Sequence, residues 1–399
     1  MSVIRRYLLD EISKDALAQG KIAFISGPRQ VGKTTMTQTL LKELRQEQNY
    51  FTWDDDEFRK AWTKDPKSLI RQIPRASLVV LDEIHKDRKW KSKIKGIYDL
   101  LKNDYKFIVT GSARLDYFRK SGDSLQGRYL PYRLHPFTLG ETNRVKPPPE
   151  KDWDELLTKT FSLSDLINYG GFPEPQYLQD QKQVQRWQRL YRERMIREDL
   201  RDLQEVRDVR QVETLAILLQ EKAAGQLSYE SLREDLSVSF ETVKRWIDLL
   251  ETLYYSYRIP PYSKAIRYSL KKEPKIFLYD WSLAQNQGAK FENLVAGHLL
   301  KSCHAWTDCA MGEFQLFYLR DKLKREVDFL ITKDSKAFAL VEVKSGESEP
   351  TPALLYYQKI LKPDFCIQVV RNTRKEKGKL LQHPGVQVLS AERFLGSLN

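Results

Sequence analysis

The residues with the clearest chemical pattern lie near the start of the chain, in a glycine-rich loop. Residues 22–35 read IAFISGPRQVGKTT, which is a short apolar strand, then Gly-x-x-x-x-Gly-Lys-Thr, then a predicted helix. Gly27 and Gly32 let the backbone turn tightly and bring its N–H groups against phosphate oxygens, and the helix N-terminus adds the positive end of its dipole. In this context, such a loop predicts binding of a nucleoside triphosphate, whereas a chance glycine-rich turn would lack the flanking strand and helix.

Each residue of the loop has an expected role. Lys33 should reach the β and γ phosphates, and the Thr34 hydroxyl should coordinate Mg²⁺. We therefore predict ATP and Mg²⁺ as cofactors. The residues expected to contact the nucleotide are Gly27, Pro28, Arg29, Gln30, Val31, Gly32, Lys33, Thr34 and Thr35.

A second apolar strand, SLVVLDE, ends in two carboxylates. Asp82 is expected to hold Mg²⁺ through water, and Glu83 to polarise the water that attacks the γ phosphate. The alternative, an acidic strand end in an ordinary sheet, is disfavoured because the strand follows a phosphate-binding loop. The tetrapeptide DEIH also fits a helicase box, but the helical stretch after residue 150 does not supply the second nucleotide-type domain of a helicase. We therefore predict hydrolysis as well as binding.

Two further residues could act on the same reaction. Ser112 follows the strand KFIVTG and would place a hydroxyl beside the γ phosphate as a sensor. Arg128, after Gly127, supplies a guanidinium that could neutralise transition-state charge on a neighbouring subunit's nucleotide, which requires a homo-oligomer. The alternative for Arg128 is a salt bridge on the surface of its own subunit.

A separate group of carboxylates lies near the C-terminus. In the strand AFALVEVKS, the alternation of residues puts Glu342 and Lys344 on one face. Asp328 ends the preceding strand segment EVD, and Glu292 lies on the predicted helix AKFENLVAG. Asp followed by Glu-x-Lys is typical of metal-dependent phosphodiesterases, in which the carboxylates hold Mg²⁺ and the lysine steadies charge. The alternative is a structural Glu–Lys pair on a surface strand.

Composition sets the limits of the function. The 399 residues are 41% hydrophobic and 30% charged, as expected for a soluble globular protein of two or three domains. The formal charge of +13 favours a polyanionic partner such as DNA. No apolar run is long enough to cross a bilayer and the start MSVIRRYLLDEI is amphipathic, so we expect a cytoplasmic protein without a membrane partner.

The elements that must position these residues fall into three predicted domains. Alternating strands and helices over residues 1–145 predict a parallel α/β sheet covered on both faces. Helical periodicity dominates residues 146–262, where helix, turn, helix and ribbon suggest a winged helix whose recognition helix, residues 239–250, exposes Lys244 and Arg245. The alternative is a helical lid that packs against protein. Residues 263–399 predict a third, α/β unit.

Taken together, the segments GPRQVGKTT, VVLDEIHK, VTGSAR, LQGRYL, YGGFPE, FEN, EVDF and VEVKSGE resemble a large prokaryotic family of AAA-type ATPases. The C-terminal region of that family, long labelled a domain of unknown function, has a restriction-endonuclease-like core. The resemblance implies an AAA-like P-loop ATPase domain, a helical and winged-helix middle, and a C-terminal α/β restriction-endonuclease-like domain, assembled as an oligomer. Two residues depart from the pattern: Ser112 stands where many AAA proteins have Asn, and Val327 rather than Pro precedes Asp328.

The sequence therefore predicts a Mg²⁺-dependent ATPase that acts on DNA, with hydrolysis coupled to a metal-dependent nuclease-like domain. The first alternative is an oligomeric ATP-driven DNA motor that does not cleave. The second is an ATP-controlled assembly switch whose C-terminal domain only binds DNA or protein.

Overall fold

A computed structural model describes residues 4–111, 125–143, 161–199, 208–263, 273–346, 349–372 and 384–398. The contacts within the chain divide it after His135, into a unit of residues 3–135 and a unit of residues 136–399.

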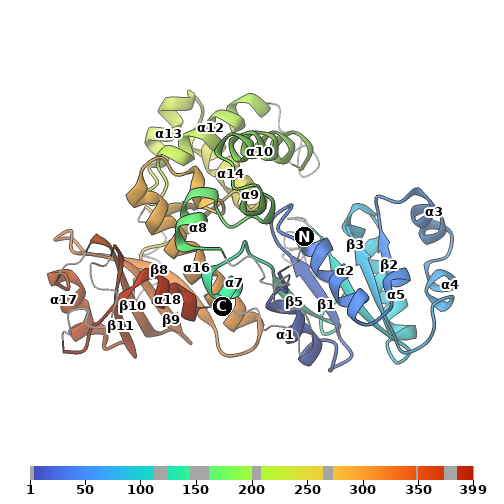
Figure 1. The fold of residues 1–399 in the computed structure, drawn as a ribbon. Coiled ribbons are helices and arrows are strands. Elements are labelled where there is room, and N and C mark those ends of the chain that lie inside the picture. The colour runs from blue at the N-terminus through green and yellow to red at the C-terminus, as the bar shows by residue number, and fades with distance from the viewer. Residues whose placement is uncertain are drawn as a thin grey trace. The chain divides into compact units, whose positions relative to one another are not determined.

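The first unit is built on a parallel sheet of five strands in the order β2-β3-β4-β1-β5 (Figure 1). The strands are β1 (Ile22–Ser26), β2 (Tyr50–Thr52), β3 (Ser77–Asp82), β4 (Tyr105–Thr110) and β5 (Tyr129–Arg133). The helices are α1 (Leu8–Lys14), α2 (Lys33–Glu43), α3 (Asp56–Lys64), α4 (Pro66–Arg71) and α5 (Trp90–Leu101), with single turns η1 (Glu47–Asn49) and η2 (Ile84–Lys86). The parallel α/β sheet predicted for this region is confirmed.

Both faces of this sheet are covered because its strands are apolar on both sides. Phe24 of β1 packs in a cluster with residues of α3 and α5, such as Trp62 and Ile94. Its neighbour Ile25 points the other way, into a cluster with Leu9 of α1 and Met36 of α2. Fully buried parallel strands of this kind end together at one edge of the sheet, and ligands bind beyond their carboxyl ends.

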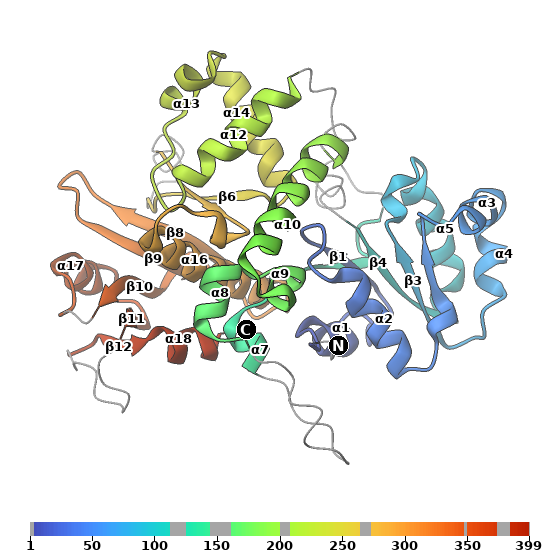
Figure 2. The same cartoon turned by 45° about the horizontal axis from the view of Figure 1, so that its top comes forward.

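The second unit begins with helices and a short two-stranded sheet (Figure 2). The helices are α7 (Leu139–Asn143), α8 (Leu163–Tyr169), α9 (Pro173–Leu178), α10 (Gln181–Arg194) with a π-helical turn η3 (Met195–Asp199), α12 (Val209–Glu221), α13 (Tyr229–Leu236) and α14 (Phe240–Thr252). After α14, β6 (Ser256–Ile259) pairs antiparallel with β7 (Lys275–Leu278). This order of helices and ribbon agrees with the pattern from which a winged helix is predicted, and the assignment itself stays a prediction.

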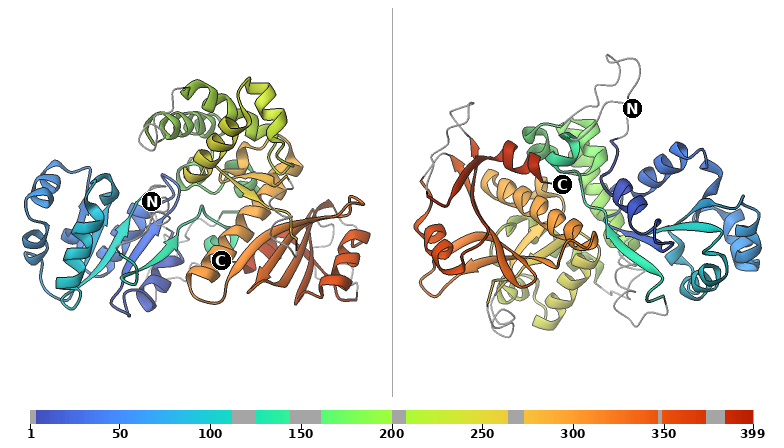
Figure 3. Two further views of the ribbon diagram at one scale, coloured as in Figure 1. Left: turned by 180° about the vertical axis from the view of Figure 1, so that it is seen from behind. Right: turned by 90° about the horizontal axis from the view of Figure 1, so that it is seen from below.

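The rest of the second unit carries a mixed sheet, whose strands run from orange to red in Figure 3. The order of its strands is β12-β11-β10-β9-β8. Its strands are β8 (Phe314–Arg320), β9 (Glu326–Lys333), β10 (Lys336–Gly346), β11 (Phe365–Asn372) and β12 (Gln387–Ser390). Strands β8, β9 and β10 are antiparallel, whereas β10, β11 and β12 are parallel. The helices are α16 (Gln287–Asp308), α17 (Pro352–Leu361) and α18 (Ala391–Ser397), with a single turn η4 (Trp281–Leu283).

Two features of this unit hold the C-terminal sheet in place. Leu354 of α17 packs on Leu330 and Leu340 in one apolar cluster, and the ring of Phe277 on β7 lies 5.9 Å from that of Phe329 on β9. The strands β9 and β10, which carry the carboxylates, pair antiparallel within this packed sheet. Over the parts of the chain with described structure, no helix has the length and apolar character needed to cross a membrane.

Candidate functional site

The glycine-rich loop follows β1 and leads directly into α2. Gly27 has φ +154°, and a Cβ there would lie 2.3 Å from the carbonyl oxygen of Leu134. Gly32 takes a left-handed conformation with φ 97° as the N-cap of α2. Neither position accepts another residue without strain, because one has no room for a side chain and the other requires positive φ. The two glycines that define the sequence motif are thus required by the fold of the loop.

Lys33 is the first residue of α2 and is only 7% exposed. Its Nζ donates to the carbonyl oxygens of Gly27, at 2.9 Å, and Pro28, at 2.7 Å. These bonds hold the ammonium over the loop, at the N-terminus of the helix, where an anion is favoured. The position fits the predicted contact with the phosphates.

Asp82, at the carboxyl end of β3, is the meeting point of three hydroxyl groups. Thr34 Oγ1 donates to Asp82 Oδ2 at 2.7 Å. Tyr50 on β2 donates to the same oxygen, and Thr110 on β4 donates to Oδ1. The first of these bonds joins the two residues expected to serve one Mg²⁺, and hydroxyl and carboxylate oxygens are the ligands this ion prefers. The residues present therefore fit the ion that accompanies ATP.

The sequence motifs do not predict that Tyr50 belongs to this site. Burial raises the pKa of its hydroxyl, and the hydrogen bond to Asp82 raises it further. The phenol thus stays protonated and donates to the carboxylate. β2 and β3 pair in a register that sets Thr52 beside Asp82, which brings Tyr50 close to that carboxylate.

Glu83 directly follows β3 and has a left-handed backbone, with φ 55°. Such a conformation is uncommon for a residue other than glycine and is often found at functional sites. Burial raises the pKa of the Glu83 carboxyl, against the opposing effect of Lys33 and Lys86. Glu83 Oε2 lies 3.6 Å from Lys86 Nζ and 3.6 Å from His85 Nε2. Its closeness to Lys33 and Asp82 agrees with the role of a residue that orients water.

Arg128 does not join this site in its own chain. The parallel pairing of β1 and β5 sets Ile22 beside Tyr129, so Arg128 lies at the amino ends of the strands, whereas the loop lies at the carboxyl ends. Its guanidinium instead contacts Asp99, with distances of 2.7 Å and 3.0 Å. A role on a neighbouring subunit's nucleotide stays a prediction, as does the sensor role of Ser112, which lies outside the described residues.

Arg6 contacts the glycine-rich loop, although the sequence motif of the loop does not predict this contact. Its side chain is buried, and Nη1 donates to the carbonyl oxygen of Val31 at 2.6 Å. In the sequence, Arg6 lies two residues from Ile4 and two from Leu8, and both of these apolar residues are buried. This spacing is the sequence feature that indicates an interior position for the arginine. Burying a charged group is costly unless its donors are satisfied, so Arg6 and the loop carbonyl stabilise each other.

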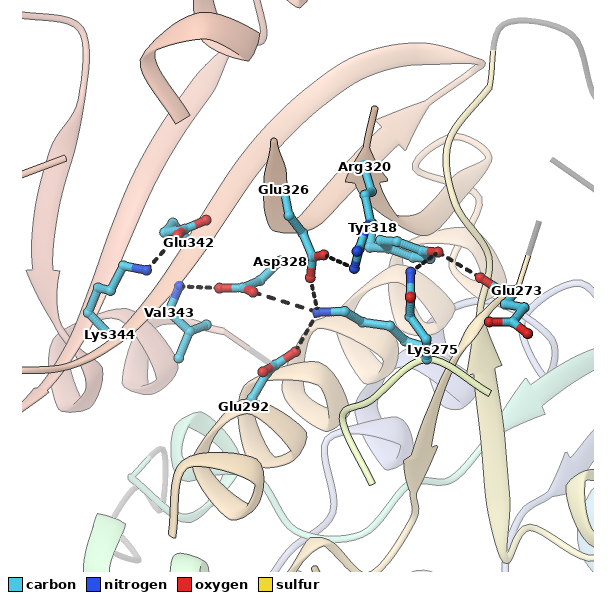
Figure 4. A network of polar contacts seen from close by, with 11 residues as sticks. Glu273, Lys275, Glu292, Tyr318, Arg320, Glu326, Asp328, Glu342, Val343 and Lys344 are labelled. Atoms are coloured by element: carbon cyan, nitrogen blue, oxygen red, sulfur yellow. Dashed lines mark hydrogen bonds and ion pairs between the residues drawn. The ribbon is translucent and has the colours of Figure 1, made fainter. Parts of the chain in front are cut away.

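In the second unit, the predicted C-terminal carboxylates meet a lysine (Figure 4). Lys275, on β7, is 4% exposed. Its Nζ lies 2.7 Å from Glu326, 3.0 Å from Glu292 and 3.7 Å from Asp328. Burial disfavours the charged ammonium, but Glu292, Asp328 and Glu326 outweigh burial and raise the pKa of Lys275.

Glu342 lies on the neighbouring strand with a different partner. Its Oε1 accepts from Lys344 at 2.7 Å, and its buried Oε2 has no hydrogen-bond partner among the described residues. Burial and the nearby Asp328 raise the pKa of Glu342 to about 7. Asp328 Oδ2 accepts from the backbone N–H of Val343 at 2.8 Å. The predicted Glu342–Lys344 pair thus forms beside Asp328, but separately from the Lys275 contacts.

The arrangement does not fit a divalent metal ion held jointly by Glu292, Asp328 and Glu342. Within the described ranges, no three His, Cys, Asp or Glu side chains are grouped so that they could hold one metal. Glu292 and Asp328 meet at an ammonium, and Glu342 meets a second one. Neither Lys275 nor Glu326 was expected from the sequence, although a lysine opening the buried strand KIFL is itself an unusual feature.

The geometry of the first unit defines a P-loop nucleotide-binding domain, and comparison of sequences agrees. Residues 19–143 match a family described as an AAA domain. Residues 160–293 and 287–393 match two families described as domains of unknown function, DUF8612 and DUF4143. The first match supports the AAA-type P-loop ATPase that the sequence predicts, and the other two carry no statement of function.

Relatives are found in distant prokaryotes. A protein of Methanocaldococcus jannaschii is 23% identical over 407 residues, covering 91% of this chain and 83% of its own length. One from Haemophilus influenzae is 22% identical over 304 residues, covering 70% and 74%. One from Mycobacterium tuberculosis is 21% identical over 337 residues, covering 82% and 71%. All three are described as uncharacterized, so they extend the similarity along the chain without adding an activity.

Proposed function

We propose that this chain is a Mg²⁺-dependent ATPase that acts on DNA, with hydrolysis coupled to a C-terminal domain of restriction-endonuclease-like architecture. The observation that carries the proposal is the 2.7 Å bond between Asp82 and Thr34, the residue that follows Lys33. Two sequence motifs separated by 48 residues converge there on the groups that phosphoryl transfer requires.

The roles follow from the positions. Lys33 and the backbone N–H groups of the loop bind and orient the phosphates. Mg²⁺, when bound with ATP, neutralises charge that develops on the phosphate oxygens, and Thr34 and Asp82 are placed to hold it. Glu83 orients water beside the γ phosphate and draws a proton from it. Tyr50 and Thr110 fix the Asp82 carboxylate so that it does not reorient during the reaction.

The coupling is proposed to run through the segment that follows β5. Leu134 contacts Gly27 of the loop through its carbonyl oxygen, and α7 begins only five residues later, in the second unit. α7 is anchored there by Glu141, whose buried carboxylate lies 2.5 Å from Lys301 of α16. A shift of the glycine-rich loop during hydrolysis would therefore displace the segment that joins β5 to α7, and α7 is fixed in the second unit by the Glu141–Lys301 ion pair.

DNA is proposed as the partner on the basis of charge and shape. The chain has a formal net charge of +13, which is far more positive charge than the binding of ATP requires. α14 buries Val243, Trp246 and Ile247 against its own unit and leaves Lys244 and Arg245 exposed. The order α16, three antiparallel strands, α17 and a parallel strand agrees with a restriction-endonuclease-like domain. Since the carboxylates do not fit a shared metal ion, the geometry favours action on DNA without cleavage.

The test combines turnover with DNA substrates. The pure full-length protein is incubated with linear, branched and single-stranded DNA, with and without Mg²⁺ and ATP. We expect ATP hydrolysis that DNA stimulates, ATP-dependent strand displacement or movement, and intact DNA backbones. Hydrolysis with no response to any DNA would favour the switch, and absence of hydrolysis with absence of ATP binding would refute the proposal.

A further inference from the structure

We propose that the ammonium of Lys275 is the resident cation of the C-terminal carboxylate site, so that this site binds no divalent metal ion. The inference deepens the proposed function, on which its statement about DNA rests, whereas its statement about the metal ion holds whether or not the chain hydrolyses ATP. Its consequence is a domain of nuclease-like architecture that engages DNA without cutting it.

The position of Lys275 is defined from three sides. The lysine comes from β7, Glu292 from α16, and Glu326 and Asp328 from β9 (Figure 4). Its stem is buried, with Nζ 5.7 Å from the centre of the Tyr318 ring. The ammonium therefore stands where the carboxylates of two different elements converge, which is the place a bridging cation would take.

The ammonium cannot readily leave this position. The next three residues of β7, Ile276, Phe277 and Leu278, are fully buried, and β7 pairs with β6 along its length. Swinging Lys275 out would expose a buried stem and leave the carboxylates without their counter-charge. Removing one partner from a buried ion pair is strongly destabilising, and here one cation serves three anions.

The charges around Lys275 are nearly balanced without a metal. The carboxyl groups of Glu292, Glu326 and Asp328 are opposed by the ammonium of Lys275 and by the guanidinium of Arg320, which lies 3.0 Å from Glu326. Mg²⁺ requires close, nearly octahedral oxygen ligands and gives up its water reluctantly. Placing it beside the ammonium would crowd like charges in a poorly solvated space, which is strongly unfavourable.

Glu342 places a further carboxylate beside this site. Its Oε2 is buried without a hydrogen-bond partner among the described residues. Phe329 pairs with Val341 in the sheet, so Asp328 and Glu342 occupy adjoining positions on neighbouring strands. Replacing Lys275 by an apolar residue would remove the counter-charge between Glu292 and Asp328, so that these carboxylates and Glu342, which are not grouped around one point as they stand, can close on a cation. We expect such a variant to recruit a divalent cation.

The experiment measures metal binding directly. Mn²⁺ is titrated into the full-length chain without nucleotide, by calorimetry and by electron paramagnetic resonance. The single variant Asp328→Asn should give the same Mn²⁺ binding isotherm as the wild type. Lys275→Met should bind Mn²⁺ with an affinity at least ~10-fold higher than that of the wild type. The double variant Lys275→Met, Asp328→Asn should lose this additional binding. Lys275→Arg, which keeps the charge, and Lys336→Met, an exposed lysine on β10, should gain no site.

Two results would overturn the proposal. The first is a Mn²⁺ ion in the wild type that Asp328→Asn removes, or Mg²⁺-dependent DNA cleavage by the wild type that Asp328→Asn abolishes. The second is a folded Lys275→Met variant that binds no more Mn²⁺ than the wild type, folding being checked by circular dichroism. If that variant does not fold, the comparison of wild type with Asp328→Asn still decides. Because these titrations contain no ATP, their failure is distinct from failure of the ATPase assignment.

Discussion

The hydroxyl of Thr34 donates to the carboxylate of Asp82 across 2.7 Å, and this bond joins the first turn of α2 to the end of β3. The two residues come from separate motifs, and either motif could occur by chance. Because Lys33 precedes Thr34 and Glu83 follows Asp82, this contact brings the loop lysine and the predicted water-orienting glutamate to the proposed metal-binding pair. That convergence is the strongest structural support for ATP hydrolysis.

Lys33→Ala and Glu83→Gln should separate binding from hydrolysis. Lys33→Ala removes the ammonium that holds the phosphates, so we expect it to lose both ATP binding and turnover. Glu83→Gln keeps the shape of the side chain but cannot accept a proton, so turnover should fall by about 10²–10⁴-fold while ATP still binds. Calorimetry with ATP and a phosphate-release assay measure the two effects. Equal turnover in Glu83→Gln and wild type would remove Glu83 from the site.

Tyr50→Phe tests whether the hydroxyls around Asp82 matter for the metal. The substitution deletes one hydrogen bond to a buried carboxylate, which should loosen its orientation and weaken Mg²⁺-dependent ATP binding about 10-fold or more. The measurement is turnover as a function of Mg²⁺ concentration. Tyr7→Phe is the matched control, because that hydroxyl donates to the backbone of Arg133, at 3.1 Å, and not to the Asp82 carboxylate. A parallel response of both variants would make the effect a general one on stability.

Local patterns predicted only part of this site. The loop and the Asp82–Glu83 pair follow from short motifs, because each motif lies on a single strand and the turn after it. Tyr50, Arg6 and Lys275 come from elements distant in sequence, and only the pairing of strands or packing of helices brings them in. Arg128 shows the same limit, since the parallel pairing of β5 with β1 decides at which end of the sheet it lies. The parallel sheet itself was predictable, because its strands are continuous apolar runs.

Charge reversal on α14 tests the proposed DNA contact. Lys244→Glu and Arg245→Glu alter only exposed side chains, so we expect unchanged unfolding temperature and weaker DNA binding. Each lost phosphate contact should also reduce the slope of log K against log salt by about 1. Fluorescence anisotropy at several salt concentrations gives both quantities. Lys60→Glu on α3, likewise exposed, changes net charge equally and should have a smaller effect. If all three variants weaken binding alike, α14 is not a recognition helix.

The pH dependence of stability should reveal His298 on α16. Its ring is fully buried, and burial lowers the pKa of the imidazole to about 3. Nε2 accepts from the backbone N–H of Leu139, at 3.0 Å, so the neutral ring carries its proton on Nδ1, which donates to Leu294. Protonation would abolish the first bond and place a second cation near Lys301. The folded unit therefore resists proton uptake that the unfolded chain accepts.

The sign of the effect follows from the lowered pKa. Above the ordinary pKa of histidine, near 6.5, both states are neutral and the contribution of His298 is complete. As the pH falls toward 3 the unfolded chain gains a proton that the folded unit does not, so stability declines by about 1.4 kcal/mol per pH unit from this group alone. His298→Gln cannot titrate, so its free energy of unfolding, measured with urea, should fall less steeply with pH than that of the wild type. Identical slopes would mean that His298 already carries a proton in the folded unit, and would contradict its hydrogen bond with α7.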